Sequence, residues 1–111
     1  MNDNKLSLNQ LAKRAHAISK SKGFYDRQPP LMEQLVLVHA EVSEAVEASR
    51  VGDDRLRIDD KGKPVGVPAE LADVLIRVLD ICANRGIDIE EAVSKKLAYN
   101  ETRPYKHGKK F

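Results

Sequence analysis

Two pairs of acidic residues have a spacing that suits the binding of a metal ion. Glu41 and Glu44 are three positions apart, and so are Glu70 and Asp73. Within a helix, residues three apart project from neighbouring points of one face. Four carboxylates held close together would repel one another unless a positive charge lay between them. Because every donor is an oxygen, the set predicts a hard cation, Mg²⁺ or Mn²⁺, that keeps waters and is shared with a phosphate substrate.

An acidic pair on a helix is also common as solvated surface, and the chain has 17 acidic residues. The residues alone therefore leave both interpretations open. The sequence lacks the ExxH pair of di-iron bundles, a phosphate-binding glycine loop, an HExxH motif and a nucleophile-elbow serine. His16, His39 and His107 are far apart and are expected at the surface or satisfied in the interior. Cys82 lies on an apolar helical stripe and is predicted to be a core residue.

Helix signals dominate the elements that must position the acids. We predict four helices, near residues 8–22, 30–51, 68–85 and 89–100. Ser7 is the expected N-cap of the first, with Gln10 closing a capping box, and Asp88 is the expected cap of the last. The remaining start and stop signals are prolines and glycines, namely Pro29-Pro30, Pro68, Gly23, Gly52 and Gly86.

Helical geometry places both acidic pairs on the same side of their helices. Measured from the centre of each apolar stripe, Glu41 and Glu44 fall at about −80° and −140°, and Glu70 and Asp73 at about −100° and −160°. If the two helices pack antiparallel with their stripes facing, both pairs line one edge of the interface. Residues 53–66, between these helices, predict a loop with a short hairpin around Lys61-Gly62. In the last helix, Ala92, Val93 and Leu97 are expected to face inward.

Length and composition indicate a single all-α domain over residues 1–111. Four helices bury little surface in one copy, so we expect a homodimer or homotetramer to complete the bundle. The net charge is +2, and residues 101–111 alone carry +3, so the body of the chain is no general nucleic-acid binder, although its basic tail could contact an anion. One cysteine excludes an internal disulfide framework, and the polar start MNDNKLSLNQ and the lack of a long apolar run predict a cytoplasmic protein without a membrane span.

Four stretches, in this order, resemble the MazG-like nucleotide pyrophosphohydrolases of the all-α NTP pyrophosphatase superfamily. They are Glu41-Val-Ser-Glu44, Glu70-Leu-Ala-Asp73 with the following residues to Asp80, the segment Gly86-Ile-Asp-Ile-Glu-Glu-Ala-Val, and the end of the last helix from Lys96 through Asn100 and Arg103 to Lys106. The resemblance spans about residues 30–107. One departure is Ala40, where the family often has a further acid.

The resemblance implies hydrolysis of a nucleoside triphosphate to the monophosphate and pyrophosphate, as in the cleaning of nucleotide pools. It implies that Glu41, Glu44, Glu70 and Asp73 hold Mg²⁺ and that one of them also serves as the base for the attacking water. It further implies that Lys96, Asn100 and Arg103 contact the triphosphate. Positive charge at the C-terminus of a helix is also favoured by the helix dipole alone, which would account for Lys96 without any substrate.

Other residues have structural and functional interpretations side by side. Arg77 could contact phosphate, but we favour a structural role in which it pairs with Asp73 and Asp80 along its own helix. Phe24 and Tyr25 could stack on a base, but we expect them to anchor a loop. The alternative to an enzyme is a non-catalytic helical module that binds a nucleotide, a nucleic acid or a partner protein.

Overall fold

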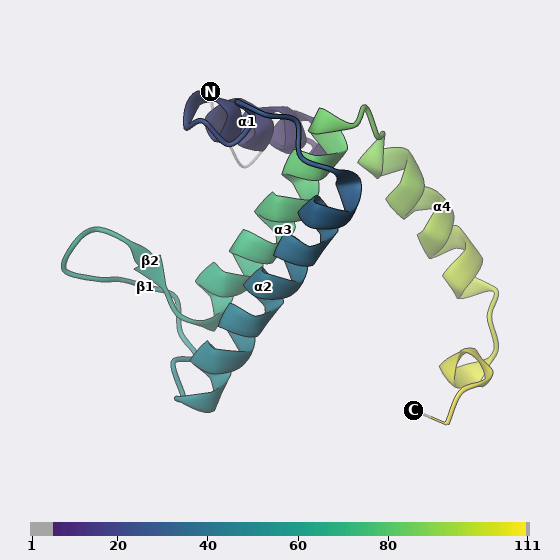
Figure 1. Ribbon diagram of the computed structural model, residues 1–111. Coiled ribbons are helices and arrows are strands. Elements are labelled where there is room, and N and C mark those ends of the chain that lie inside the picture. Colours follow the sequence, from purple (N-terminus) through teal and green to yellow (C-terminus); the bar gives the residue numbers. More distant parts are fainter. Residues whose placement is uncertain (1–5, 111) are drawn as a thin grey trace.

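The computed structural model describes residues 6–110, and the chain in this range is mostly helical (Figure 1). Its helices are α1 (Leu8–Ser21), α2 (Leu31–Arg50), α3 (Val67–Asn84) and α4 (Ile89–Glu101), followed by a short 3₁₀ turn at Tyr105–Gly108. The all-α prediction is confirmed, and every boundary of the four helices lies within one residue of its predicted position. Within residues 6–110, no helix has the length and hydropathy needed to cross a membrane.

Side-chain caps begin two of the helices as predicted. The Ser7 hydroxyl accepts from the backbone N–H of Gln10 at 3.2 Å, and the Gln10 side chain accepts from the Ser7 N–H at 2.8 Å. Asp88 accepts from the N–H of Glu91 at 3.0 Å at the start of α4. The amide of Asn9 in α1 donates to Asp88 at 2.9 Å. The beginning of α4 is thus tied to α1 by polar contacts.

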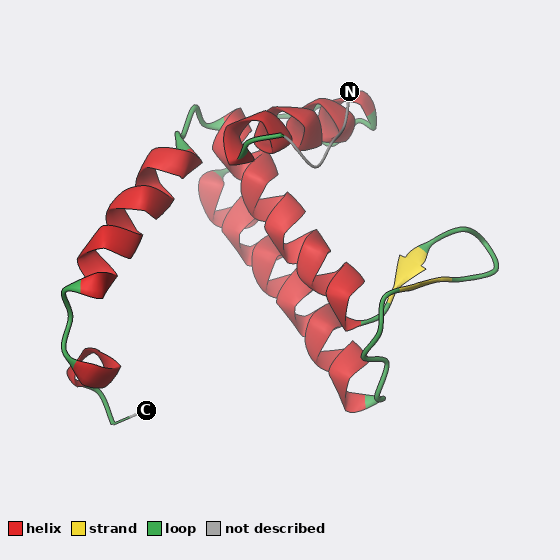
Figure 2. Ribbon diagram, turned by 180° about the vertical axis from the view of Figure 1, so that it is seen from behind, coloured by secondary structure: helices red, strands yellow, loops and turns green. Residues whose placement is uncertain are grey.

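The helices pack around α3. Figure 1 shows α2 and α3 side by side and antiparallel, with α1 crossing the end of α3 where that helix finishes. Viewed from behind, α4 again leans away from α2 and α3 (Figure 2). Among the described residues, the buried apolar side chains come mainly from α3 and are Ala12, Ala69, Leu79, Ile81 and Cys82. The prediction that Cys82 is a core residue is confirmed.

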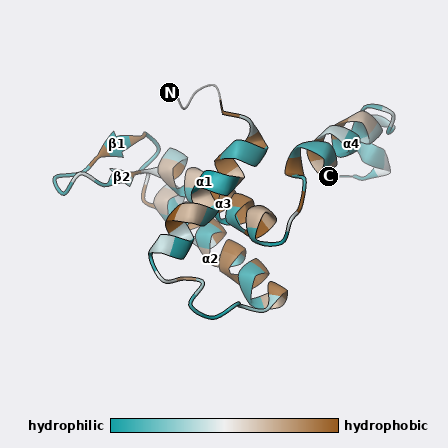
Figure 3. Ribbon diagram, turned by 90° about the horizontal axis from the view of Figure 1, so that it is seen from above, coloured by the Kyte–Doolittle hydropathy of each residue, from teal (hydrophilic) through white to brown (hydrophobic). Residues whose placement is uncertain are grey.

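Helix α4 has no buried residue, so the inward orientation predicted for Ala92, Val93 and Leu97 is wrong for the single chain. Leu97 is 58% exposed, because the main contact of α4 within residues 6–110 is a small one with α1. Hydrophobic residues also recur along α2 (Figure 3), where Leu35 and Val46 are each at least half exposed. One copy of the chain therefore leaves much of its apolar surface in contact with water.

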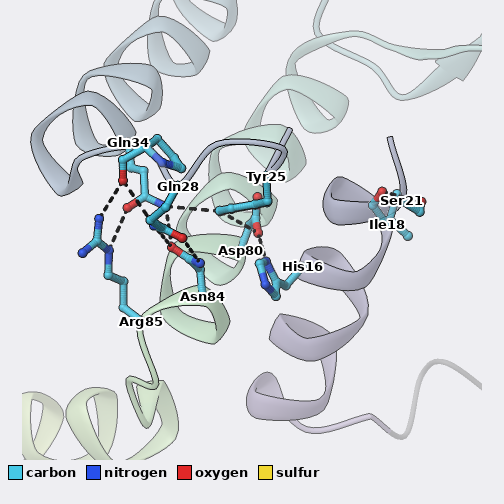
Figure 4. A network of polar contacts seen from close by, with 10 residues as sticks. His16, Ile18, Ser21, Tyr25, Gln28, Gln34, Asp80, Asn84 and Arg85 are labelled. Atoms are coloured by element: carbon cyan, nitrogen blue, oxygen red, sulfur yellow. Dashed lines mark hydrogen bonds and ion pairs between the residues drawn. The ribbon is translucent and has the colours of Figure 1, made fainter. Parts of the chain in front are cut away.

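A polar network at the junction of α1, α2 and α3 centres on Asp80, which is 6% exposed (Figure 4). Its carboxylate accepts from His16 Nδ1 at 2.8 Å and from the Tyr25 hydroxyl at 3.1 Å. The rings of His16 and Tyr25 also meet edge to face, with centroids 4.5 Å apart. Burial, and then the charge of Asp80, raises the pKa of Tyr25. Tyr25 thus anchors the connector between α1 and α2, as the sequence predicts.

The network continues through Gln34, the buried amide of α2. Gln34 donates to the Tyr25 hydroxyl at 3.2 Å and to Asn84 Oδ1 at 2.9 Å, and it accepts from Arg85 Nε at 2.9 Å. Asn84 also exchanges hydrogen bonds with Gln28 at 2.9 and 3.0 Å. These contacts lock the C-terminal end of α3 to the start of α2.

Asp80→Ala is expected to lower the free energy of unfolding by about 2 kcal/mol, because it leaves two polar groups without their buried acceptor. Urea unfolding followed by far-UV circular dichroism measures this loss. Asp60→Ala is the matched control, since Asp60 is exposed. Equal unfolding midpoints for the two variants would contradict the structural importance of the Asp80 network.

The predicted hairpin is present as β1 (Arg57–Ile58) and β2 (Pro64–Val65), which pair antiparallel. Arg57 lies opposite Val65, and Ile58 lies opposite Pro64. The hairpin projects beside the first turn of α3 (Figure 1). It is therefore next to the part of α3 that carries two of the four predicted metal ligands.

Candidate metal centre

Three of the four predicted ligands converge between α2 and α3. Each of Glu41, Glu70 and Asp73 offers a carboxylate oxygen, and these three oxygens lie within 4.8 Å of one another. Glu41 and Glu70 are half-buried, whereas Asp73 is exposed. The antiparallel packing of α2 on α3 brings residues 41 and 70–73 to one edge, as the helical spacing predicts. We call these three residues the acidic cluster.

Glu44 is not part of the acidic cluster. It is exposed, and it does not contribute an oxygen to the set that converges within 4.8 Å. Its assignment as a fourth ligand stays a prediction.

Arg77 adds a positive charge at the rim of the acidic cluster. Its guanidinium donates to Glu41 Oε1 at 3.1 Å, across the interface between α3 and α2. The expected pairs with Asp73 and Asp80 along its own helix are not formed. Asp80 instead accepts from His16 and Tyr25. The structural role of Arg77 is therefore to join two helices.

The electrostatics of the cluster favour a cation. Desolvation, and next the charge of Glu41, raises the pKa of Asp73, while Lys63 and Arg77 oppose that rise. Three carboxylates against the two cations Arg77 and Lys63 leave net negative charge in a small volume. Oxygen donors from a few carboxylates, with other positions left for water and phosphate, are what Mg²⁺ takes in proteins. The residues present fit such an ion, and Glu41, Glu70 and Asp73 would hold it.

Two of the clefts near the acidic cluster extend toward the connector between α1 and α2. One of about 190 Å³ is bounded by Glu41 and Asp73 on one side and by Lys22 and Phe24, at the end of α1, on the other. The second, of about 320 Å³, reaches the connector between α1 and α2, and Phe24, Arg77 and Asp80 line both clefts. Phe24 is 66% exposed, so unlike Tyr25 it does not anchor the connector. Nothing in the sequence indicated Lys22 in the lining of the smaller cleft, because a lysine next to a helix-ending glycine is common.

The predicted substrate contacts are not brought to the acidic cluster within one chain. Lys96 and Asn100 lie in the second half of α4, which leans away from α2 and α3, and Arg103 follows the end of that helix (Figures 1 and 2). Lys96 and Arg103 flank the Tyr99 ring, with Nζ and Cζ at 5.9 and 5.7 Å from its centroid. Their role in binding substrate stays a prediction.

Asp73→Asn is expected to raise the melting temperature of the metal-free protein at pH 7 by a few degrees. Because the pKa of Asp73 is raised by folding, its proton stabilises the folded state at low pH, and that contribution is lost as pH rises through the folded pKa. The gain from the substitution should thus be present at neutral pH and absent in acid. Thermal melts with EDTA across this pH range measure it, and a lower melting temperature for the variant at pH 7 would contradict the crowding of charge.

Mg²⁺ should act in the opposite direction, by stabilising the wild type more than the Asp73→Asn variant. Added to the wild type, it should raise the melting temperature, since a ligand that binds only the folded state stabilises it. In Asp73→Asn the increase should be smaller.

The fold and the cluster define an all-α protein with two antiparallel central helices that present carboxylates suited to a divalent cation. Among curated proteins, a dATP/dGTP diphosphohydrolase of Cyanophage S-2L is 47% identical to the chain over 38 residues, which is 34% of this chain and 36% of that protein. The match thus spans about a third of the relative's length. No known family profile matches the chain. No solved structure matches it either.

Proposed function

We propose that the protein is a Mg²⁺-dependent nucleoside triphosphate pyrophosphohydrolase that yields a nucleoside monophosphate and pyrophosphate. The observation that carries this proposal is the convergence of Glu41, Glu70 and Asp73 from two helices. The short match to a dATP/dGTP diphosphohydrolase supports the same reaction class. A role in cleaning the nucleotide pool follows from that class.

The reaction needs one water and one phosphoanhydride bond. Water attacks the α-phosphorus, the bond from that phosphorus to the oxygen bridging the α and β phosphates breaks, and pyrophosphate leaves. A bound divalent ion supplies charge stabilisation to the phosphate oxygens and makes water easier to deprotonate. Glu41, Glu70 and Asp73 would hold that ion, with Glu44 as a fourth ligand. One of these carboxylates accepts the proton of the attacking water.

The active form is a homodimer or homotetramer in which α4 of one copy serves the acidic cluster of another. Two features support this arrangement. The apolar sides of α2 and α4 are exposed in one copy, at Leu35, Val46 and Leu97 among others. The basic end of α4, with Lys96 and Arg103 free of ion pairs within residues 6–110, carries the charge that a triphosphate at the acidic cluster requires.

A substrate panel tests the proposed reaction. Ordinary and modified ribo- and deoxyribonucleoside triphosphates, dATP and dGTP included, are incubated with the protein and Mg²⁺, and phosphate is measured after pyrophosphatase is added. We expect release from at least one triphosphate that requires both Mg²⁺ and the added pyrophosphatase. No release from any of them would overturn the enzyme proposal. Tight binding of a non-hydrolysable triphosphate without turnover would favour the alternative, a nucleotide-binding module.

A further inference from the structure

The hairpin that precedes α3 has a rigid base. Gly66, its last residue before α3, has φ +103°, and a Cβ there would collide with the carbonyl oxygen of Arg55. The N–H of Val67 donates to the carbonyl of Asp53 at 2.8 Å. Arg57 pairs with the Asp53 carboxylate at 3.2 Å. The hairpin is therefore held in place beside the first turn of α3.

The tip of the hairpin is organised by Asp59. Its carboxylate accepts from the backbone N–H groups of Lys61 and Lys63, both at 2.9 Å, and these bonds lower the pKa of Asp59. The Asp59 N–H in turn donates to the Lys63 carbonyl at 2.9 Å. Both the N–H and the carbonyl of Lys63 are thus hydrogen-bonded to Asp59, so the backbone is fixed and only the side chain is free to move.

Lys63 lies near the acidic cluster. Lys63 and Asp73 line the same cleft, of about 490 Å³, whose apolar wall includes Leu56 and Ile76. Lys63 and Arg77 are the two cations whose charges lower the pKa of Asp73. Arg77 is engaged with Glu41, whereas Lys63 is exposed and makes no ion pair within residues 6–110.

We propose that Lys63 binds a phosphate group of the triphosphate at the acidic cluster, so that the hairpin forms the phosphate-side wall of the site. This inference rests on the proposed function. A triphosphate carries more negative charge than one divalent ion neutralises, and the acidic cluster adds its own. A lysine without an ion pair, on a turn whose backbone is already fixed, supplies the missing positive charge with little loss of conformational entropy on binding. A purely structural lysine that only relieves repulsion among the acids would not affect triphosphate affinity beyond its effect on the metal.

Calorimetric titration separates these roles. A triphosphate with an imido bridge between the α and β phosphates is titrated with Mg²⁺ into the wild type, Lys63→Met, Lys63→Arg and Lys61→Met. Lys61 is the matched control, because it is a lysine of the same exposed turn but does not line the cleft. We expect Lys63→Met to weaken triphosphate binding about tenfold, as for the loss of one charged contact. Lys63→Arg should recover much of the affinity, and Lys61→Met should match the wild type.

Titration with Mg²⁺ alone gives the second readout. Lys63→Met should bind Mg²⁺ at least as tightly as the wild type, since it removes a competing positive charge. Equal triphosphate affinity in Lys63→Met and Lys61→Met would overturn this inference and leave the proposed function standing. Weaker Mg²⁺ binding that accounts for the whole loss of triphosphate affinity would also overturn it. A wild type that neither binds nor hydrolyses any triphosphate would overturn both.

Discussion

Glu70→Gln and Asp73→Asn are each expected to lower the rate of triphosphate hydrolysis by at least about 10³-fold. Charge stabilisation by a bound metal contributes several kcal/mol to such a reaction, and each 1.36 kcal/mol is a factor of ten. The substitutions keep the shape of the side chain and remove one of three converging carboxylates. Steady-state assays with Mg²⁺ on the preferred triphosphate measure the loss. Glu44→Ala should also abolish turnover if Glu44 is the fourth ligand.

Glu47→Gln is the control for these variants. Glu47 lies on the same helix as Glu41, but it is exposed, and within residues 6–110 its one ion pair is with Arg50 at 3.9 Å. We expect wild-type activity from Glu47→Gln and wild-type helicity from all the variants. A substantial residual rate in both Glu70→Gln and Asp73→Asn would contradict the assignment of the acidic cluster as the metal site.

Two inactive variants are expected to restore activity to each other when they share one oligomer. The first is Glu70→Gln, and the second combines alanine at Lys96, Asn100 and Arg103. If α4 acts on the acidic cluster of the other copy, a dimer with one chain of each kind has one complete site and one site with both defects. Its rate should be about half that of the wild-type dimer, as the two-fold symmetry of the assembly requires.

Co-expression with two different affinity tags isolates the mixed dimer, and its activity is compared with that of each parent. Both parents should be nearly inactive. A mixed dimer as inactive as its parents would show that the two sets of residues act within one chain. In that case α4 would have to fold back onto α2 and α3, because in one copy it leans away from them.

The order, extent and caps of the helices could be predicted from the sequence. Ser7, Gln10 and Asp88 act on backbone groups three residues away, so their effect depends on local geometry alone. The shared edge of Glu41, Glu70 and Asp73 was also predictable, because it follows from helical periodicity once two adjacent helices pack antiparallel. The hairpin was predictable for the same local reason, a turn at Lys61-Gly62.

Contacts across the interior were decided by the tertiary structure alone. Asp80 accepts hydrogen bonds from His16 and Tyr25, which precede it by 64 and 55 positions in the sequence. Arg77 pairs with Glu41 on α2 instead of with Asp80. The placement of Lys63 beside Asp73 likewise depends on how the hairpin is braced against α3. Local spacing cannot reveal such contacts, since each depends on which side chains the packed helices bring together and which competing partner is closer. For α4 the local pattern misled, because an apolar stripe signals a surface that must be covered and says nothing about which chain covers it.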